Sequence, residues 1–196
     1  LAAHGSNLIP ARGQLPAQAQ VELFATMARE ASATLTRVSS PTDVPEAIAQ
    51  FLKSENLPSR IAMAPDPWLG SLGWDRQKLL AIRRGRAEPD DEVGVTVAFA
   101  AVAETGTLML LSGPLTPTTL NLLPETHIVV LRVSQVVGAY EEAWARLRQA
   151  RGGEGVVAMP RTVNFITGPS RSADIEQQLQ MGAHGPRRLH IVLVDG

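Results

Sequence analysis

The N-terminal part of the chain shows helical periodicity followed by a short apolar run. Apolar residues recur every three or four positions over 17–38, which predicts an amphipathic helix there. Thr42-Asp43 precedes a proline, a combination typical of a helix start, and this second helix is expected to end near Asn56. The apolar run at 61–64, which stops at a proline, predicts a short buried strand.

The segment 65–92 lacks a clear period and is predicted to be irregular, with a short helix around Leu79. Its charged part contains Arg83, Arg84 and Arg86, a basic cluster that a nucleic acid would attract. Four acidic residues follow directly within 88–92. The mixture of signs favours a solvated loop over a nucleic-acid contact.

The centre of the chain is its most hydrophobic part. In 93–114 both alternating faces are apolar, as in strands that are covered on two sides, and Glu104-Thr105-Gly106 is expected to form a turn between them. A short helix over 117–122 and a buried strand over 127–133 follow, and then a longer amphipathic helix over 136–147.

The C-terminal part repeats the alternation of strands and helices. A strand near Asn164 should lead into a helix that begins in the Ser-Arg-Ser-Ala-Asp segment and ends near Gly182. After a turn at 184–186, the chain should finish in the strand 189–195. This alternation predicts an α/β protein with an open, mostly parallel sheet flanked by helices. We expect residues 1–16 to form an arm or loop and 17–196 to form a single domain.

Composition narrows the possible partners. The 196 residues carry a net charge of −1, so there is no general attraction to nucleic acid or to an anionic membrane. The chain contains no cysteine, which excludes disulfides, thiolate nucleophiles and cysteine-ligated clusters within it. No run approaches the roughly 18 apolar residues of a membrane span. We therefore expect a cytoplasmic protein without a membrane partner.

Glu104 is the most informative single residue. It is an ionisable group inside a long uncharged stretch that should be largely buried. A buried carboxylate costs several kcal/mol unless it is paired, hydrogen-bonded or placed at a cleft. One interpretation is a catalytic acid, base or nucleophile. The other is a carboxylate at a strand end that accepts backbone hydrogen bonds from the turn.

Two further turns carry hydroxyl groups and exposed amides at the two ends of one predicted strand. The first consists of Thr105, Gly106 and Thr107, and the second contains Ser112 and Gly113. Such groups can bind phosphate, but the same triplets are common in ordinary turns. Each is a weak signal when taken alone.

The segment around Arg171 is a stronger candidate for an anion site. Gly168, Ser170, Arg171 and Ser172 lie where the predicted strand becomes a helix, and helix N-terminal amides favour anions. Asp174 and Glu176 follow in the first turn of the predicted helix, where their negative charges would repel a phosphate. An acidic side chain there could instead accept a hydrogen bond from a ligand hydroxyl group, or form an ion pair with Arg171. Simple helix capping explains the serines but not the arginine.

Other site signals are sparse. The four histidines show no ligand spacing, so no metal site is expected, and only His184, in a turn next to glycine, is placed near a site. There is no GxGxxG, GxxxxGK[ST] or GxSxG motif, and we expect no cofactor.

Three ordered segments together resemble a known family. They are AETGTLMLLSGP, LLPETHIVVLRVSQVV and NFITGPSRSADIEQQLQMGAHGPRRLHIVLVD, and they are similar to the lactate utilization protein C family with its LUD domain. The resemblance is dense over 91–195. It implies a fold similar to the sugar-phosphate isomerases and coenzyme A transferases. In those transferases a strand-end glutamate attacks the acyl group, and Glu104 is the analogue by position.

The resemblance also implies a function. It implies a role in oxidising L-lactate to pyruvate together with iron-sulfur partner proteins, and the absence of cysteine fits a subunit without its own cluster. Relatives are expected to carry an arginine after Ser-Gly-Pro, whereas 115–120 has none.

Three hypotheses remain open at this level. The chain is a subunit of a lactate-oxidising assembly that binds a small anionic ligand, or an autonomous transferase or isomerase that uses Glu104 on a coenzyme A or sugar-phosphate substrate. The third is an interaction module whose motifs only shape turns.

Overall fold

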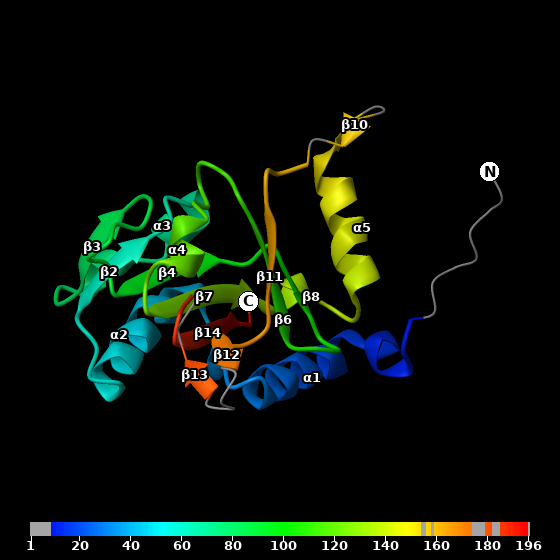
Figure 1. Ribbon diagram of the computed structural model, residues 1–196, viewed down its shortest axis with the longest axis horizontal. Helices are drawn as coiled ribbons and strands as arrows, with labels where there is room; N and C mark the ends of the chain where they lie inside the picture. Colours follow the sequence, from blue (N-terminus) through cyan, green and yellow to red (C-terminus); the bar gives the residue numbers. More distant parts are fainter. Residues whose placement is uncertain (1–8, 154–155, 158, 174–178, 182–184, 196) are drawn as a thin grey trace.

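The computed structural model describes residues 9–153, 156–157, 159–173, 179–181 and 185–195. Its centre is a six-stranded sheet in which every pairing is parallel, with the order β1-β14-β7-β4-β2-β3 (Figure 1). The strands are β1 (Thr34–Val38), β2 (Arg60–Met63), β3 (Ala81–Arg84), β4 (Val93–Val97), β7 (Thr126–Arg132) and β14 (Arg188–Val194). The predicted mostly parallel α/β architecture is confirmed.

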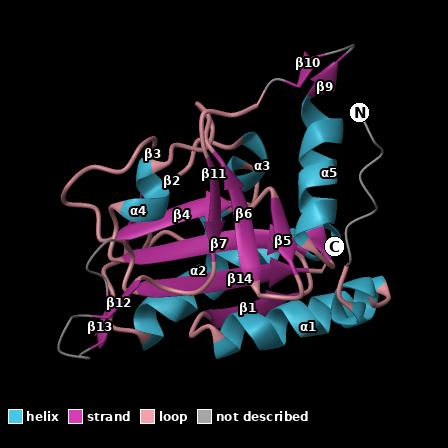
Figure 2. Ribbon diagram, turned by 45° about the vertical axis from the view of Figure 1, so that its right-hand side comes forward, coloured by secondary structure: helices cyan, strands magenta, loops and turns pink. Residues whose placement is uncertain are grey.

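A second, four-stranded sheet has the order β11-β6-β5-β8. Its strands are β5 (Ala100–Val102), β6 (Thr107–Leu111), β8 (Val136–Val137) and β11 (Val163–Ile166). The β11–β6 and β6–β5 pairs are antiparallel and the β5–β8 pair is parallel. In Figure 2 the strands β6 and β11 run across the direction of β4, β7 and β14. The sequence predicted strands in this region but not a separate sheet.

Helices complete a layered arrangement. They are α1 (Ala17–Glu30), α2 (Val44–Ser54), α3 (Pro67–Gly70), α4 (Thr119–Leu122) and α5 (Tyr140–Arg151), with the 3-10 helices η1 (Ala11–Gln14), η2 (Pro41–Asp43), η3 (Trp74–Arg76) and η4 (Val133–Gln135). The remaining strands form two short hairpins: β9 (Gly152–Gly153) with β10 (Val156–Val157), and β12 (Arg171–Ala173) with β13 (Leu179–Met181).

Three apolar clusters hold these layers together. One packs α2 against one face of the parallel sheet, with Ile48 and Phe51 among its members. The second packs α1 and the four-stranded sheet against the opposite face, with Phe24 and Leu108 at its centre. The third packs α5 against the outer side of the four-stranded sheet, where Leu147 is fully buried. Strands β7 and β14 are buried on both faces, which explains their unbroken apolar runs.

The predicted helix over 17–38 is wrong in its second half. The helix α1 ends at Glu30, and Ser32 takes a positive φ of 68°, a left-handed backbone conformation that stops a helix. The chain then enters β1, where Leu35 faces the core from a strand instead of a helix. The helical spacing of Leu35 with α1 was therefore accidental.

The short helix predicted around Leu79 is also absent. Leu79 lies in a turn and is 86% exposed, and β3 follows at once beside β2. Because β3 is a partly exposed edge strand with two arginines, its sequence lacks the apolar run that marked the central strands. Arg83 of this strand forms ion pairs with Glu88 and Asp91 of the charged loop.

Candidate functional site

The predicted site residues divide between the two ends of β6. Strand β11 is antiparallel to β6, with Ile166 opposite Leu108 and Val163 opposite Leu111. The chain leaving β11 therefore lies beside Thr107, whereas the chain entering β11 lies beside Ser112. A strand of this length separates its two ends by about 14 Å. Ser112 and Gly113 therefore lie at the end of β6 opposite Glu104, as the two turns were expected to lie at the two ends of one strand.

Glu104 lies in the turn between β5 and β6 and is only 7% exposed. Its backbone N–H donates to the carbonyl of Gly138, 3.1 Å away, which ties the turn to the segment before α5. Within the described part of the chain, its Oε2 atom has no hydrogen-bond partner. Glu104 is therefore buried, as expected. Its Oε2 atom accepts no backbone hydrogen bond from the turn.

A network of hydroxyl groups surrounds this turn. Thr107 Oγ1 lies 2.8 Å from Thr105 Oγ1 and 2.6 Å from Thr167 Oγ1. The hydroxyl of Tyr140, at the start of α5, lies 3.1 Å from Thr105 Oγ1 and 2.9 Å from Thr107 Oγ1. We call Glu104–Thr107 with Tyr140 and Thr167 the closed end of β6. Its hydroxyl groups bind one another and link three elements.

Two glycines allow the closed end to contact α1. Gly106 has a φ of +67°, and a Cβ at this position would lie 2.3 Å from the backbone N of Ala28. Gly168 has a φ of +72°, and a Cβ there would lie 2.0 Å from the carbonyl oxygen of Ala31. Both positions require glycine, because a side chain is excluded by the backbone conformation and by the helix.

The helix predicted to begin at Ser-Arg-Ser is wrong, because Arg171–Ala173 forms β12 and pairs with β13. The N–H of Ser170 donates to the carbonyl of Pro186, 2.9 Å away, and Arg171 donates to the carbonyl of Ala31 at the C-terminus of α1. These contacts hold the backbone extended against its local helix preference.

Arg171 also donates to the hydroxyl of Ser32, so its guanidinium contacts the exposed carboxyl end of α1. A cation there complements the helix dipole, which gives Arg171 a structural role in this arrangement. A role for Gly168, Ser170, Arg171 and Ser172 in ligand binding stays a prediction. Asp174 and His184 lie outside the described residues.

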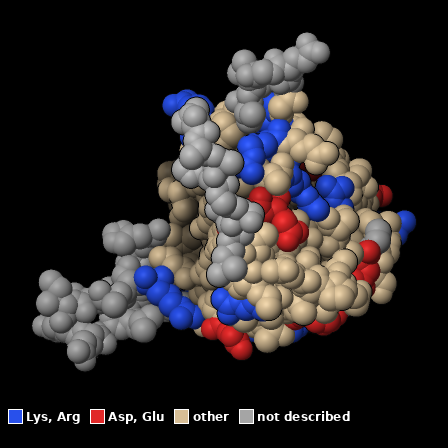
Figure 3. Space-filling model, turned by 90° about the vertical axis from the view of Figure 1, so that its right-hand side faces the viewer, with Lys and Arg blue, Asp and Glu red and all other residues tan. Residues whose placement is uncertain are grey.

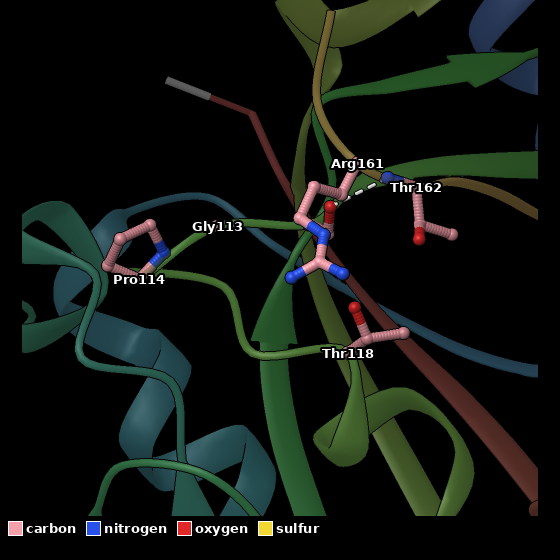
Figure 4. Close-up of a pocket in the computed structure, with 6 residues that line it drawn as sticks. Gly113, Pro114, Thr118, Arg161 and Thr162 are labelled. Atoms are coloured by element: carbon pink, nitrogen blue, oxygen red, sulfur yellow. Dashed lines mark hydrogen bonds between the residues drawn. The ribbon is translucent and has the colours of Figure 1, made fainter.

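The opposite end of β6 opens into a cleft of about 590 Å³. Its described lining residues, which we call the Arg161 cleft, are Ser112, Gly113, Pro114, Thr118, Arg161 and Thr162. Figure 4 shows the guanidinium of Arg161 pointing toward Thr118, with Pro114 on the far side of the space. The N–H of Thr162 donates to Ser112 Oγ at 2.8 Å, which fixes the two loops relative to each other.

Arg161 was not among the residues predicted from the sequence to form a site. It precedes β11 and lies more than forty positions after the Ser-Gly-Pro turn in the chain. Only the antiparallel pairing of β11 with β6 brings it to that turn. The segment 115–120 has no arginine, and in the folded chain Arg161 supplies a basic side chain to the cleft that Thr118 lines.

Two buried histidines lie in the parallel sheet, away from the ends of β6. His127 Nε2 lies 2.7 Å from Thr96 Oγ1, and His190 Nδ1 lies 2.8 Å from Thr34 Oγ1. The ring of His190 stacks on Phe51 at a centroid distance of 3.8 Å. Burial lowers the pKa of His127 to about 3 and the pKa of His190 to about 4, so both side chains are neutral at pH 7.

The described residues contain no group of three or more His, Cys, Asp or Glu side chains arranged to hold a metal ion. On the face shown in Figure 3, basic and acidic side chains are interspersed. Among the helices that the structure describes, none combines the length and apolar character needed to span a membrane.

The fold and the two ends of β6 define an open α/β protein with a polar cleft beside its parallel sheet. Comparison with known sequences gives the family: the LUD domain matches residues 85–194. The chain therefore belongs to the LUD domain family. The matched segment includes both ends of β6 and the strands β4, β7 and β14 of the parallel sheet.

Curated relatives within this range are named for lactate utilization. The chain is 37% identical over 105 residues to lactate utilization protein C 1 of Bacillus mycoides, covering 53% of this chain and 44% of the relative. It is 39% identical over 104 residues to lactate utilization protein C of Bacillus subtilis, covering 52% and 42%. In each case the match spans about half the length of the curated relative or less. The predicted resemblance to the lactate utilization protein C family is confirmed.

A solved structure shares the fold over nearly the whole chain. The crystal structure of a DUF162 family protein from Deinococcus radiodurans, at 1.70 Å resolution, superposes with a TM-score of 0.62 at 23% sequence identity. The likeness covers 92% of this chain and 99% of that chain. It extends the relationship in fold to the N-terminal part, which the matched LUD segment does not include.

Proposed function

We propose that this protein serves in lactate utilization, as a ligand-binding subunit that supports the oxidation of L-lactate to pyruvate. The observation that carries the proposal is the match to several proteins named lactate utilization protein C, at 37–39% identity. The matched half of the chain is also the half that forms both ends of β6.

The redox step is assigned to partner proteins. Oxidation of lactate to pyruvate removes two electrons and two protons, so an electron acceptor is required. The 196 residues contain no cysteine, and therefore no thiolate that could ligate an iron-sulfur cluster. We propose that iron-sulfur subunits supply the acceptor, and that residues 17–196 form the single domain that associates with them.

Growth of the source organism tests the role. Deletion of the gene should abolish or strongly slow growth on L-lactate while growth on pyruvate is retained, because only the oxidation step is lost. Reintroduction of the gene should restore growth. Normal growth of the deletion strain on L-lactate as sole carbon source would contradict the proposal.

Association with partners is tested separately. An affinity-tagged copy of the chain, purified from lactate-grown cells, should retain proteins that carry iron-sulfur clusters, visible by iron content and by electron paramagnetic resonance. A tagged version of an unrelated protein of similar size provides the control. Recovery of the chain without any cluster-bearing protein would argue against an assembly.

A second candidate function is an autonomous transferase or isomerase that uses Glu104. It is favoured by one observation: Glu104 is buried at a strand end and its Oε2 atom has no hydrogen-bond partner in the described structure. A buried carboxylate without a partner costs stability, which makes Glu104 a candidate for a functional group. In a transferase reaction the carboxylate would attack a thioester carbonyl and release coenzyme A as the thiolate.

The substitution Glu104→Gln separates this function from a structural role. If Glu104 is the nucleophile or base, the variant should lose turnover of acyl-coenzyme A or sugar-phosphate substrates, while the melting temperature stays nearly unchanged. The amide has almost the same shape and removes a buried charge. A fall of several degrees in the melting temperature would instead identify a structural carboxylate.

A further inference from the structure

We propose that the Arg161 cleft binds a small carboxylate anion, with the guanidinium of Arg161 as its charged anchor. Arg161 is the only ionisable side chain among the described lining residues, and it forms no ion pair within the described part of the chain. A planar guanidinium pairs with a carboxylate through two parallel hydrogen bonds. Among its described lining residues, the cleft therefore presents a cationic fork without a competing acid.

Hydroxyl groups supply the remaining polar contacts. Ser112 Oγ accepts the N–H of Thr162, so its own hydrogen remains able to donate into the cleft. Thr118 contributes a second hydroxyl group from the opposite loop, toward which the guanidinium points (Figure 4). These groups can each donate to or accept from a ligand that carries a hydroxyl or keto oxygen beside its carboxylate.

Three backbone amides in the turn after β6 are already used, which leaves fewer donors for phosphate. The N–H of Ser112 donates to Thr162, that of Gly113 donates to Thr116, and that of Thr116 donates back to Gly113. Phosphate-binding loops depend on several free amides that converge on the anion. The described lining residues carry one positive charge beside neutral hydroxyl groups, a set that suits a monoanion better than a dianion.

The loop geometry keeps this set in place without a ligand. A bridge between Gly113 and Thr116 closes the turn after β6, and Thr116 Oγ1 donates to the carbonyl of Leu111 at 2.7 Å. Because the cleft walls are fixed by the protein's own hydrogen bonds, binding needs little reordering of the backbone. Only the Arg161 side chain, which is exposed, has to be immobilised.

The choice of a 2-hydroxy or 2-oxo acid within this class rests on the proposed function. The carboxylate anchor itself does not, because it follows from the cleft alone. The two claims therefore fail separately. Loss of growth on lactate without measurable binding would overturn only the inference drawn from the cleft. Binding without any growth phenotype would overturn only the proposed function.

Isothermal titration of the full chain with L-lactate, pyruvate, acetate and inorganic phosphate tests the inference. L-Lactate and pyruvate should bind most tightly, acetate more weakly and phosphate weakest. The variant Arg161→Gln should weaken binding of L-lactate and pyruvate by about tenfold or more, the usual consequence of losing a charge-assisted hydrogen bond. Thr118→Val should weaken binding by a few fold, since it removes one neutral donor.

A matched control is Arg76→Gln, because Arg76 is likewise an exposed arginine but does not line the cleft. It should bind every anion as the unmodified protein does. Both arginine variants should keep the original melting temperature, because neither side chain is buried. Absence of carboxylate binding, equal binding of phosphate, or unchanged affinity in Arg161→Gln would each overturn the inference.

Discussion

The two ends of β6 show how similar sequence patterns lead to different structures. Both are short turns rich in glycine, threonine or serine, and both looked equally able to hold an anion. At the closed end the hydroxyl groups of Thr105, Thr107 and Thr167 bind one another and Tyr140. At the Arg161 cleft, hydroxyl groups and a guanidinium border an open space. The closed end mainly fixes the fold, and the open end has groups left for a ligand.

Glu104 differs from the hydroxyl groups of the closed end. One of its carboxylate oxygens is buried and has no partner in the described structure, although the hydroxyl groups nearby are satisfied. A group of this kind costs stability unless the site has a use for it. We therefore expect substitutions at the closed end to change mainly the free energy of unfolding. Substitutions at the cleft should change mainly the affinity for a ligand.

The largest expected effect follows from Gly106→Ala. The substitution forces a side chain into a left-handed conformation and toward the backbone of Ala28, 2.3 Å away. It should lower the free energy of unfolding by about 3 kcal/mol or more, as measured by urea denaturation. The matched control at the other end is Gly113→Ala, where the new Cβ would lie 3.5 Å from Thr116 Oγ1, an ordinary contact. Equal losses in the two variants would remove the contrast between the ends.

The next effect concerns the sheet that supports both ends. His127 and His190 have lowered pKa values of about 3 and about 4, so the folded state resists protonation while the unfolded state takes up protons below about pH 6.5. The stability that the neutral rings contribute is fully present above about pH 6.5. It is lost as the pH falls toward the pKa values that the two histidines have in the folded protein. As the pH falls from 7 to 5, each histidine should lower the free energy of unfolding by about 2 kcal/mol.

Urea unfolding at several pH values, repeated with His190→Gln, measures this effect. The variant should lose about half of the pH dependence in that range, whatever its stability at pH 7. An unchanged slope would show that His190 is not buried as a neutral ring. If the sheet supports both ends of β6, carboxylate binding at the cleft should disappear together with the folded state at low pH.

A smaller effect is expected for Tyr140→Phe. The substitution removes the hydroxyl group that links Thr105 and Thr107 to α5, and it should lower the free energy of unfolding by about 1 kcal/mol. Binding of L-lactate or pyruvate should not change, because Tyr140 does not line the Arg161 cleft. A loss of binding in this variant would show that the two ends of β6 form one functional unit after all.

Much of the fold could be predicted from the sequence, and the exceptions have physical causes. The interior strands β7 and β14 and the helix α2 were recognisable because they are buried over continuous or periodic apolar positions. The edge strands β1 and β3 were missed, because partial exposure leaves their patterns mixed. The strand β12 was mistaken for a helix, because contacts of Ser170 and Arg171 with distant segments override its local preference.

The candidate site was predictable only in part. Ser112 and Gly113 were identified from turn chemistry, but their separation from Glu104 depends on the direction of β6. Arg161 carried no local signal, because nothing in the sequence before β11 indicates which strand it pairs with. Long-range strand pairing thus determines the site, whereas local patterns determine most of the elements.

A crystal structure of the full chain, grown with L-lactate or pyruvate, would show directly whether the Arg161 cleft is the binding site. We expect the ligand carboxylate within hydrogen-bond distance of the Arg161 guanidinium, and its 2-hydroxy or 2-oxo oxygen near the hydroxyl group of Ser112 or Thr118. A ligand bound beside Glu104, with the Arg161 cleft containing only solvent, would contradict the assignment of the open end of β6 as the binding site.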